Sequence, residues 1–188
     1  MEVLDLINSG SKQLKKNDIF SHKLDSEILL SKVMKKRREE LLVNLDQHVS
    51  SKVICGFKKL IERRSLKEPI AYILEEKEFW SKKFYVNKYA LIPRPETELL
   101  VEKIYNIYNG KKISILDIGT GSGCIILSLL SELERSNGVG IDISNEAIII
   151  AKKNALKHKL FNRVKFFNKS FFCIFNKKFD LIVSNPPY

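Results

Sequence analysis

A glycine-rich stretch in the second half of the sequence has the composition of a ligand-binding loop. Residues 119–123 read Gly-Thr-Gly-Ser-Gly and follow an apolar run that predicts a strand. In open α/β sheets ligands bind beyond the carboxyl ends of the strands, where glycines allow a close backbone approach. Cys124 stands where a dinucleotide site has its third glycine, so pyrophosphate binding is disfavoured. We therefore expect contacts to a nucleotide-like ligand from Gly119, Thr120, Gly121, Ser122 and Gly123.

A carboxylate follows the next predicted strand along the chain. Asp142 lies at the end of residues 138–143, which alternate between glycine and apolar positions. Because parallel strands end at one edge of a sheet, Asp142 is placed to accept hydrogen bonds from ribose hydroxyls. Similar glycine-rich turns followed by an acid also occur in α/β proteins that bind no nucleotide.

The tetrapeptide Asn185-Pro186-Pro187-Tyr188 has the chemistry to hold a planar NH2 group. The side-chain oxygen of Asn185 and the carbonyl of Pro186 can each accept one N–H bond, which would turn the face of the nitrogen toward an electrophile. Two prolines stiffen the turn, and Tyr188 can stack on the planar group. The pattern predicts that Asn185, Pro186 and Tyr188 are catalytic and that all four residues bind the substrate.

The elements that position these residues alternate between strand and helix. The expected strands cover residues 113–118, 138–143, 164–167 and 179–184, and the expected helices cover residues 124–133 and 144–158. Such alternation specifies an α/β fold with a parallel sheet. In a doubly wound sheet of order 3-2-1-4 the first and fourth strands are neighbours, so the turn at Asn185 should face the glycine loop.

The first half of the sequence has a different spacing of apolar residues. Residues 1–75 show apolar side chains at helical spacing and predict a small helical bundle. Aromatic and β-branched residues then predict a hairpin, and we expect residues 76–95 to connect two domains. The second domain should cover residues 96–188, beginning with a helix after the prolines at 93 and 95.

The second half resembles the class I S-adenosylmethionine-dependent methyltransferases, in which N-P-P-Y marks members that methylate amide or exocyclic amino nitrogens. Two further stretches narrow the resemblance. Residues 63–80 contain Arg-Arg, Glu-Pro-Ile-Ala-Tyr-Ile and Lys-Glu-Phe-Trp, and residues 91–98 read Leu-Ile-Pro-Arg-Pro-Glu-Thr-Glu. With these motifs, the chain is similar over its whole length to the peptide-chain release factor glutamine methyltransferases of the PrmC/HemK type.

The resemblance implies a fold, a cofactor and a substrate. The fold would be a helical substrate-docking domain followed by a Rossmann-like sheet, and the cofactor would be S-adenosyl-L-methionine. Asp142 would hold its ribose, Phe171 would lie beside its adenine, and Asn185 would contact both cofactor and substrate. The substrate would be the glutamine of the Gly-Gly-Gln loop in class I release factors, which act in translation termination.

The sequence departs from the family pattern at a few positions. Lys67 and Glu75 stand where glycines are common, which bears on turn geometry. Ser170 replaces an acid expected near the adenine amino group, which bears on cofactor affinity. Family members also continue for about another third of their length, so the resemblance implies an incomplete sheet that lacks the C-terminal part of the domain.

The composition of the sequence excludes several classes of protein. The chain has 188 residues, 44% of them hydrophobic and 29% charged, which suits a globular protein. No apolar run reaches membrane-spanning length, and the acidic first residues do not form an export signal, so we expect a cytoplasmic protein. We also expect it to be a monomer. Three scattered cysteines and three scattered histidines predict neither a disulfide framework nor a metal site.

Two alternative functions remain open at this stage. A formal net charge of +11 slightly favours an adenine-N6 or cytosine-N4 methyltransferase acting on a flipped base, although a nucleic-acid substrate is disfavoured by the whole-chain resemblance. The other alternative is a non-catalytic remnant. Residues 179–184 would then form an uncovered sheet edge, and we expect residues 1–188 alone to be poorly soluble and nearly inactive.

Overall fold

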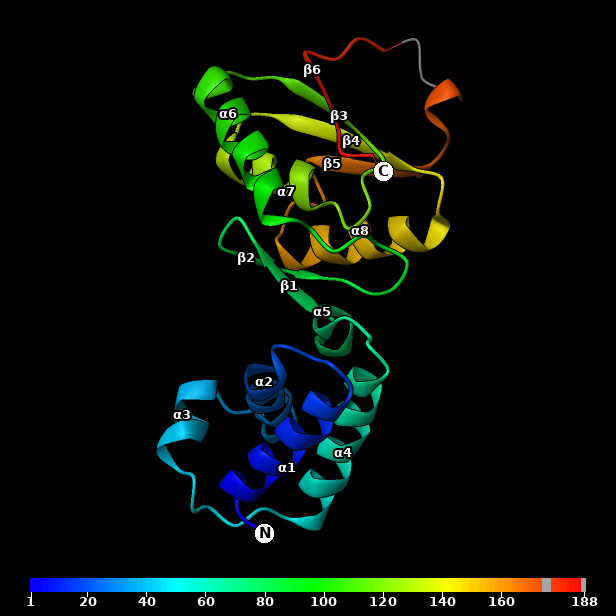
Figure 1. The fold of residues 1–188 in the computed structure, drawn as a ribbon. Helices are drawn as coiled ribbons and strands as arrows, with labels where there is room; N and C mark the ends of the chain where they lie inside the picture. Colours follow the sequence, from blue (N-terminus) through cyan, green and yellow to red (C-terminus); the bar gives the residue numbers. More distant parts are fainter. Residues whose placement is uncertain (174–176, 187–188) are drawn as a thin grey trace. The chain divides into compact units, whose positions relative to one another are not determined.

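The computed structural model describes residues 1–173 and 177–186. The chain divides into two compact units, residues 1–74 and residues 75–188, and each unit contains its own hydrophobic cluster (Figure 1). No described helix is long and apolar enough to cross a membrane.

The first unit is built from helices. These are α1 (Val3–Lys16), α2 (His22–Met34), α3 (Arg38–Val43), α4 (Ser51–Ser65) and α5 (Ile70–Leu74). Apolar side chains that recur every three or four residues line their inner faces, as in Leu6, Leu14 and Phe57. Gly10 permits close packing, because a Cβ there would lie 2.6 Å from the Phe57 ring and 2.7 Å from Ser26 Oγ.

Two buried acids on α2 pair with arginines of neighbouring helices. Asp25 accepts from Arg64 Nε of α4 at 2.7 Å, and Glu27 accepts from Arg38 of α3 at 2.6 Å. A buried carboxylate without a partner is strongly destabilising, so these pairs specify how α3 and α4 pack on α2.

Lys67 and Glu75 both adopt the left-handed backbone conformation. Their φ angles are 64° and 57°. A side chain in this region costs about 1–2 kcal/mol, which glycine avoids. The two positions where glycines are common in the family are therefore positions that require positive φ.

The second unit contains a sheet of four parallel strands. They are β3 (Ser114–Ile118), β4 (Asn137–Asp142), β5 (Val164–Asn168) and β6 (Leu181–Ser184), in the order β5-β4-β3-β6. This order confirms the predicted arrangement. Ile118 lies opposite Ile141 on one side and Ser184 on the other, so the carboxyl ends of β3, β4 and β6 meet at one edge.

The helices of this unit are α6 (Glu98–Tyr108), α7 (Cys124–Glu132) and α8 (Asn145–Lys157). They pack on the same face of the sheet (Figure 1), in one core with Ile115, Phe166 and Val183. Right-handed crossovers between successive parallel strands place the connecting helices α7 and α8 on one face. The opposite face carries Ile182 of β6, which is 59% exposed, and within the described residues β6 pairs only with β3.

A hairpin of β1 (Glu76–Phe79) and β2 (Lys82–Tyr85) opens the second unit. The sequence predicts an interdomain connector at residues 76–95, whereas the hairpin lies within this unit because Phe79 and Phe84 are buried in its core. Trp80 in the turn has a φ of 50°, and its N–H donates to Glu98 Oε1 of α6 at 2.8 Å.

Candidate functional site

The glycine loop, residues 119–123, joins β3 to α7 and is anchored to β4. The N–H groups of Gly119 and Thr120 both donate to the Ile141 carbonyl at 2.9 Å. Gly119 and Gly121 have φ angles of +71° and +54°, and an added Cβ would meet no atom closer than 4.0 Å. One side of the loop therefore faces open space, where a ligand can approach its backbone.

Gly123 serves a different purpose from the other two glycines. Its φ is +77°, and an added Cβ would lie 3.1 Å from Leu127, 3.3 Å from Ala151 and 3.4 Å from Phe166. The structure thus places Gly123 against the core, where it allows α7, α8 and β5 to pack closely.

Thr120 holds a buried acid beneath the loop. Its hydroxyl donates to Asp117 Oδ2 at 2.7 Å, and both residues are buried. Burial raises the pKa of the Asp117 carboxyl to about 7, against the hydrogen bond from Thr120, which lowers it.

Asp142 is positioned by backbone groups at the carboxyl end of β4. Its Oδ2 accepts from the Gly121 N–H and its Oδ1 from the Ser144 N–H, both at 2.9 Å. Asn168 supports the turn by donating to the carbonyls of Asp142 and Ile143 at 3.0 and 2.8 Å. Each carboxylate oxygen can accept a further hydrogen bond, so the geometry suits a diol held beside the loop.

Asn185 follows β6 directly, at the same edge as the glycine loop. Its Nδ2 donates to Thr97 Oγ1 at 3.3 Å. Thr97 ends the short helix η1 (Pro95–Thr97), which precedes α6. Pro186 is exposed, while the predicted substrate residues Pro187 and Tyr188 lie outside the described residues.

A cavity of about 360 Å³ brings most of these residues together. It is lined by Tyr89, Leu91, Ile118, Gly119, Gly121, Ile141, Asp142, Ile143, Lys169, Phe171 and Asn185. A hollow of about 40 Å³ also touches Gly119, Gly121 and Asn185 and adds Thr120, Ser122, Cys124 and Thr97 to the site. Of the predicted cofactor residues, only Gly123 lines neither space.

Residues 86–97, called the 86–97 segment, form a part of the site that the sequence did not predict. Tyr89 and Leu91 line the cavity, and Pro93 and Thr97 line the smaller hollow. Leu91, Pro93 and Thr97 belong to the motif at residues 91–98, whereas Tyr89 lies outside it. Ser170 lines neither space, and its Oγ accepts from the Phe172 N–H at 3.4 Å.

The residues that line the cavity are compatible with S-adenosylmethionine. Its volume lies in the range of ligand pockets, about 300–1,000 Å³. Apolar side chains of Ile143 and Phe171 offer surfaces for a base, and Asp142 offers acceptors for ribose hydroxyls. A Cβ on Gly119 or Gly121 would project into the space that a ligand at the loop needs.

Comparisons with known families match both units of the chain. The PrmC N-terminal domain family matches residues 5–74, and the Methyltransferase small domain family matches residues 95–188. The matched ranges agree with the helical unit and with the part of the second unit that carries the site.

Curated relatives match most or all of this chain. The release factor glutamine methyltransferase of Buchnera aphidicola subsp. Baizongia pistaciae is 44% identical over 192 residues, covering 100% of this chain and 68% of the relative. That of Buchnera aphidicola subsp. Schizaphis graminum is 48% identical, covering 87% and 59%. The bifunctional methyltransferase of Rickettsia typhi is 41% identical, covering 99% and 40%. This chain, which spans part of the length of each relative, belongs to the release factor glutamine methyltransferase family.

Proposed function

We propose that this chain binds S-adenosylmethionine and directs its methyl group to the side-chain amide nitrogen of a glutamine in class I peptide-chain release factors. The observation that carries the proposal is that Asn185 lines the same cavity as Gly119, Gly121 and Asp142. A group able to hold an amide nitrogen is therefore adjacent to a loop able to hold the cofactor.

The cofactor would lie along the glycine loop. Asp142 would accept from the ribose hydroxyls, while Ile143 and Phe171 would flank the adenine. Bound in this way, the cofactor supplies an electrophilic methyl group on a positively charged sulfur.

The acceptor side of the site works by orientation. An amide nitrogen is a weak nucleophile, because its lone pair is delocalised into the carbonyl. Asn185 Oδ1 and the Pro186 carbonyl would each accept one N–H bond and so direct the face of the nitrogen toward the methyl group. Orientation of this kind can lower a reaction barrier by up to about 7–11 kcal/mol.

The helical unit is the part we propose for docking the release factor. Phe20, between α1 and α2, is fully exposed, and Leu24 four residues later is 46% exposed. Large exposed apolar side chains of this kind are typical anchors of protein interfaces. Phe20→Ala should then weaken release-factor binding at least about tenfold and leave cofactor binding unchanged.

The central test compares Asn185→Ala with the exposed control Asn162→Ala. The protein is incubated with methyl-labelled cofactor, a release factor, and DNA or RNA. Asn185→Ala should abolish label in the release factor while S-adenosylhomocysteine affinity, measured by calorimetry, stays within about threefold of wild type. Asn162→Ala should behave like wild type.

Other results would redirect the assignment. Label in nucleic acid and none in the release factor would support the base-methylating alternative. Equal loss of methylation and cofactor binding in Asn185→Ala would make Asn185 a cofactor or structural residue.

A further inference from the structure

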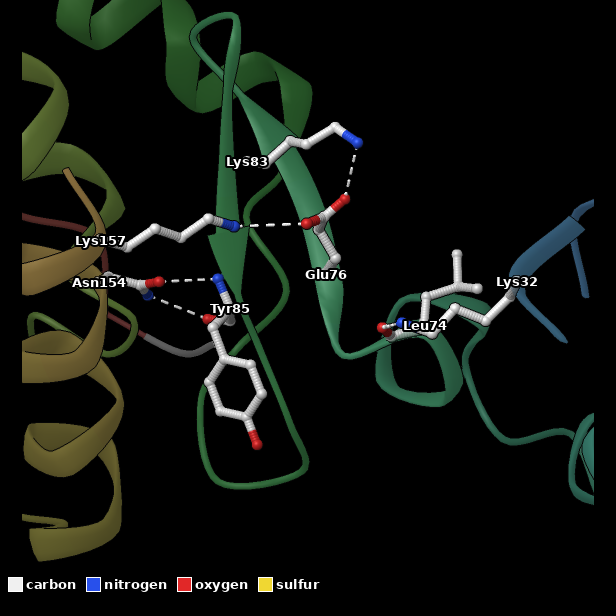
Figure 2. Close-up of polar contacts among 7 residues, drawn as sticks. All are labelled: Lys32, Leu74, Glu76, Lys83, Tyr85, Asn154 and Lys157. Atoms are coloured by element: carbon white, nitrogen blue, oxygen red, sulfur yellow. Dashed lines mark hydrogen bonds and ion pairs between the residues drawn. The ribbon is translucent and has the colours of Figure 1, made fainter. Parts of the chain in front are cut away.

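Asn154 on α8 is a fully buried polar residue whose side-chain amide makes three hydrogen bonds. Its Oδ1 accepts from the Tyr85 N–H at 2.7 Å, and its Nδ2 donates to the Tyr85 carbonyl at 3.0 Å and to the Ser122 carbonyl at 2.8 Å. Figure 2 shows the amide facing the Tyr85 backbone, with both hydrogen bonds of this pair.

These bonds join two walls of the cavity. Ser122 belongs to the glycine loop, which forms the cofactor side of the site. Tyr85 ends β2, and the chain continues directly into the 86–97 segment, which carries Tyr89, Leu91 and Thr97 to the other side. One side chain is therefore bonded to the glycine loop and to the residue that directly precedes the 86–97 segment, although neither Asn154 nor Tyr85 lines the cavity itself.

Attachment of the hairpin does not depend on Asn154 alone. Phe79 and Phe84 are buried in the core, and Lys153 Nζ lies 3.2 Å from the centroid of the Tyr85 ring. Glu76 accepts from Lys83 at 3.0 Å and from Lys157 at 3.3 Å, which ties β1 to α8 (Figure 2). What Asn154 adds is the bond to the glycine loop.

An apolar residue would be the ordinary choice at this helix position. Asn154 lies between the buried residues Ala151 and Ala155. A buried amide is tolerated only when its donors and acceptor form hydrogen bonds. A broken bond leaves a buried polar group unpaired, which costs the full desolvation free energy of that group. The three bonds therefore hold their two partner segments at a defined distance.

From this geometry we infer that Asn154 is a positioning residue that couples the glycine loop to the 86–97 segment. The inference rests on the proposed function, because it assigns the two coupled walls to cofactor and substrate. Breaking the hydrogen bonds of Asn154 should therefore disturb the glycine loop and the 86–97 segment together, even though Asn154 touches neither ligand.

The test measures backbone hydrogen exchange in the ligand-free protein. Asn154→Ala should raise exchange about tenfold or more in both the glycine loop and the 86–97 segment, because it removes all three bonds. Asn154→Asp keeps the shape and the acceptor for the Tyr85 N–H but removes both donated bonds, so it should raise exchange in the same two places. Ile148→Val, a core substitution on the same helix, is the control for general destabilisation.

A second measurement uses S-adenosylhomocysteine as a ligand, first with the wild-type protein and then with the variants. Binding of S-adenosylhomocysteine to the wild-type protein should slow exchange of the Tyr85 N–H, which lies outside the cavity. Its affinity should fall about tenfold or more in Asn154→Asp and stay within about threefold in Ile148→Val.

The outcomes separate this inference from the proposed function. Failure of S-adenosylhomocysteine to bind wild type would remove the proposed function, while the ligand-free exchange result would still decide the coupling. Exchange that rises in the hairpin but not in the glycine loop, or equally in Ile148→Val, would overturn the coupling. An exchange rate of the Tyr85 N–H that does not change when S-adenosylhomocysteine binds would also overturn the coupling.

Discussion

Asn185 Nδ2 donates to Thr97 Oγ1 at 3.3 Å, which joins two residues 88 positions apart in the sequence. The bond determines the orientation of the amide. With its nitrogen end on Thr97, its oxygen end is the one we propose to accept from the substrate nitrogen. Thr97 thus supports the acceptor geometry without being required to touch the reacting atoms.

Replacing the Thr97 hydroxyl should therefore affect turnover more than binding. We expect Thr97→Val to lower kcat for methyl transfer about tenfold or more, because small displacements in such sites cost up to about 100-fold. KM for the release factor should stay within about threefold. Thr97→Ser keeps the hydroxyl and should retain most activity; equal losses in Val and Ser variants would argue against orientation through this bond.

Asp142→Ala tests the ribose assignment. Loss of a buried acceptor for ligand hydroxyls typically costs about 1–3 kcal/mol, so S-adenosylhomocysteine affinity should fall by about 5- to 150-fold. Glu146→Ala removes an exposed carboxylate from the adjacent first turn of α8 and serves as the control in calorimetry. An unchanged affinity in Asp142→Ala would refute the assignment.

Gly119 and Gly110 form a matched pair for testing the cofactor wall. Their φ angles are +71° and +74°, and an added Cβ meets no atom within 4 Å at either position. Alanine should lower the free energy of unfolding by a similar amount at both, about 1–2 kcal/mol. Only Gly119→Ala should weaken S-adenosylhomocysteine binding, since Gly110 lies outside the cavity; similar affinities for both variants would contradict the cofactor contact.

Lys67→Gly and Glu75→Gly should stabilise the protein. Glycine relieves a left-handed strain of about 1–2 kcal/mol and costs about 0.4–1 kcal/mol in unfolded-state entropy, which leaves a gain of about 0.5–1 kcal/mol at each site. Urea unfolding measures the change. Leu66→Gly, at a neighbouring residue with φ of −79°, should instead destabilise, and a loss at Lys67 of the same size as at Leu66 would exclude relief of strain.

Asp117 should make stability depend on pH. Burial raises its folded-state pKa to about 7 from an ordinary value of 3.8, so the folded protein binds a proton that the unfolded chain releases between these values. This contribution to the free energy of unfolding is therefore greatest below about pH 4 and is lost as pH rises toward 7. Asp117→Asn removes this contribution. The free energy of unfolding of the wild type minus that of the variant should therefore fall as the pH rises from 4 to 7. A difference that is constant from pH 4 to 7 would contradict the raised pKa.

The residue pattern alone predicts the α/β order and the sheet edge at which the site forms. Apolar periodicity located the strands within two residues of their observed bounds, and the doubly wound order 3-2-1-4 predicted that the first and fourth strands, β3 and β6, are neighbours. Asp142, Asn185 and the glycine loop then had to lie at one edge, because strands in a parallel sheet end together. The strand positions depend on residue patterns within single elements, whereas the strand order follows from the alternation of strands and helices along the chain.

Which side chains complete the site depends on how distant segments pack together. Gly123 turned out to face the core, the 86–97 segment came to line the cavity, and Asn154 joined Tyr85, 69 residues away, to Ser122. The one available signal for Asn154 was a polar residue interrupting the apolar face of α8, and such a signal does not name its partners. Hydrogen bonds between segments so distant in sequence depend on how α8, the hairpin and the glycine loop pack, and that packing is a property of the folded chain.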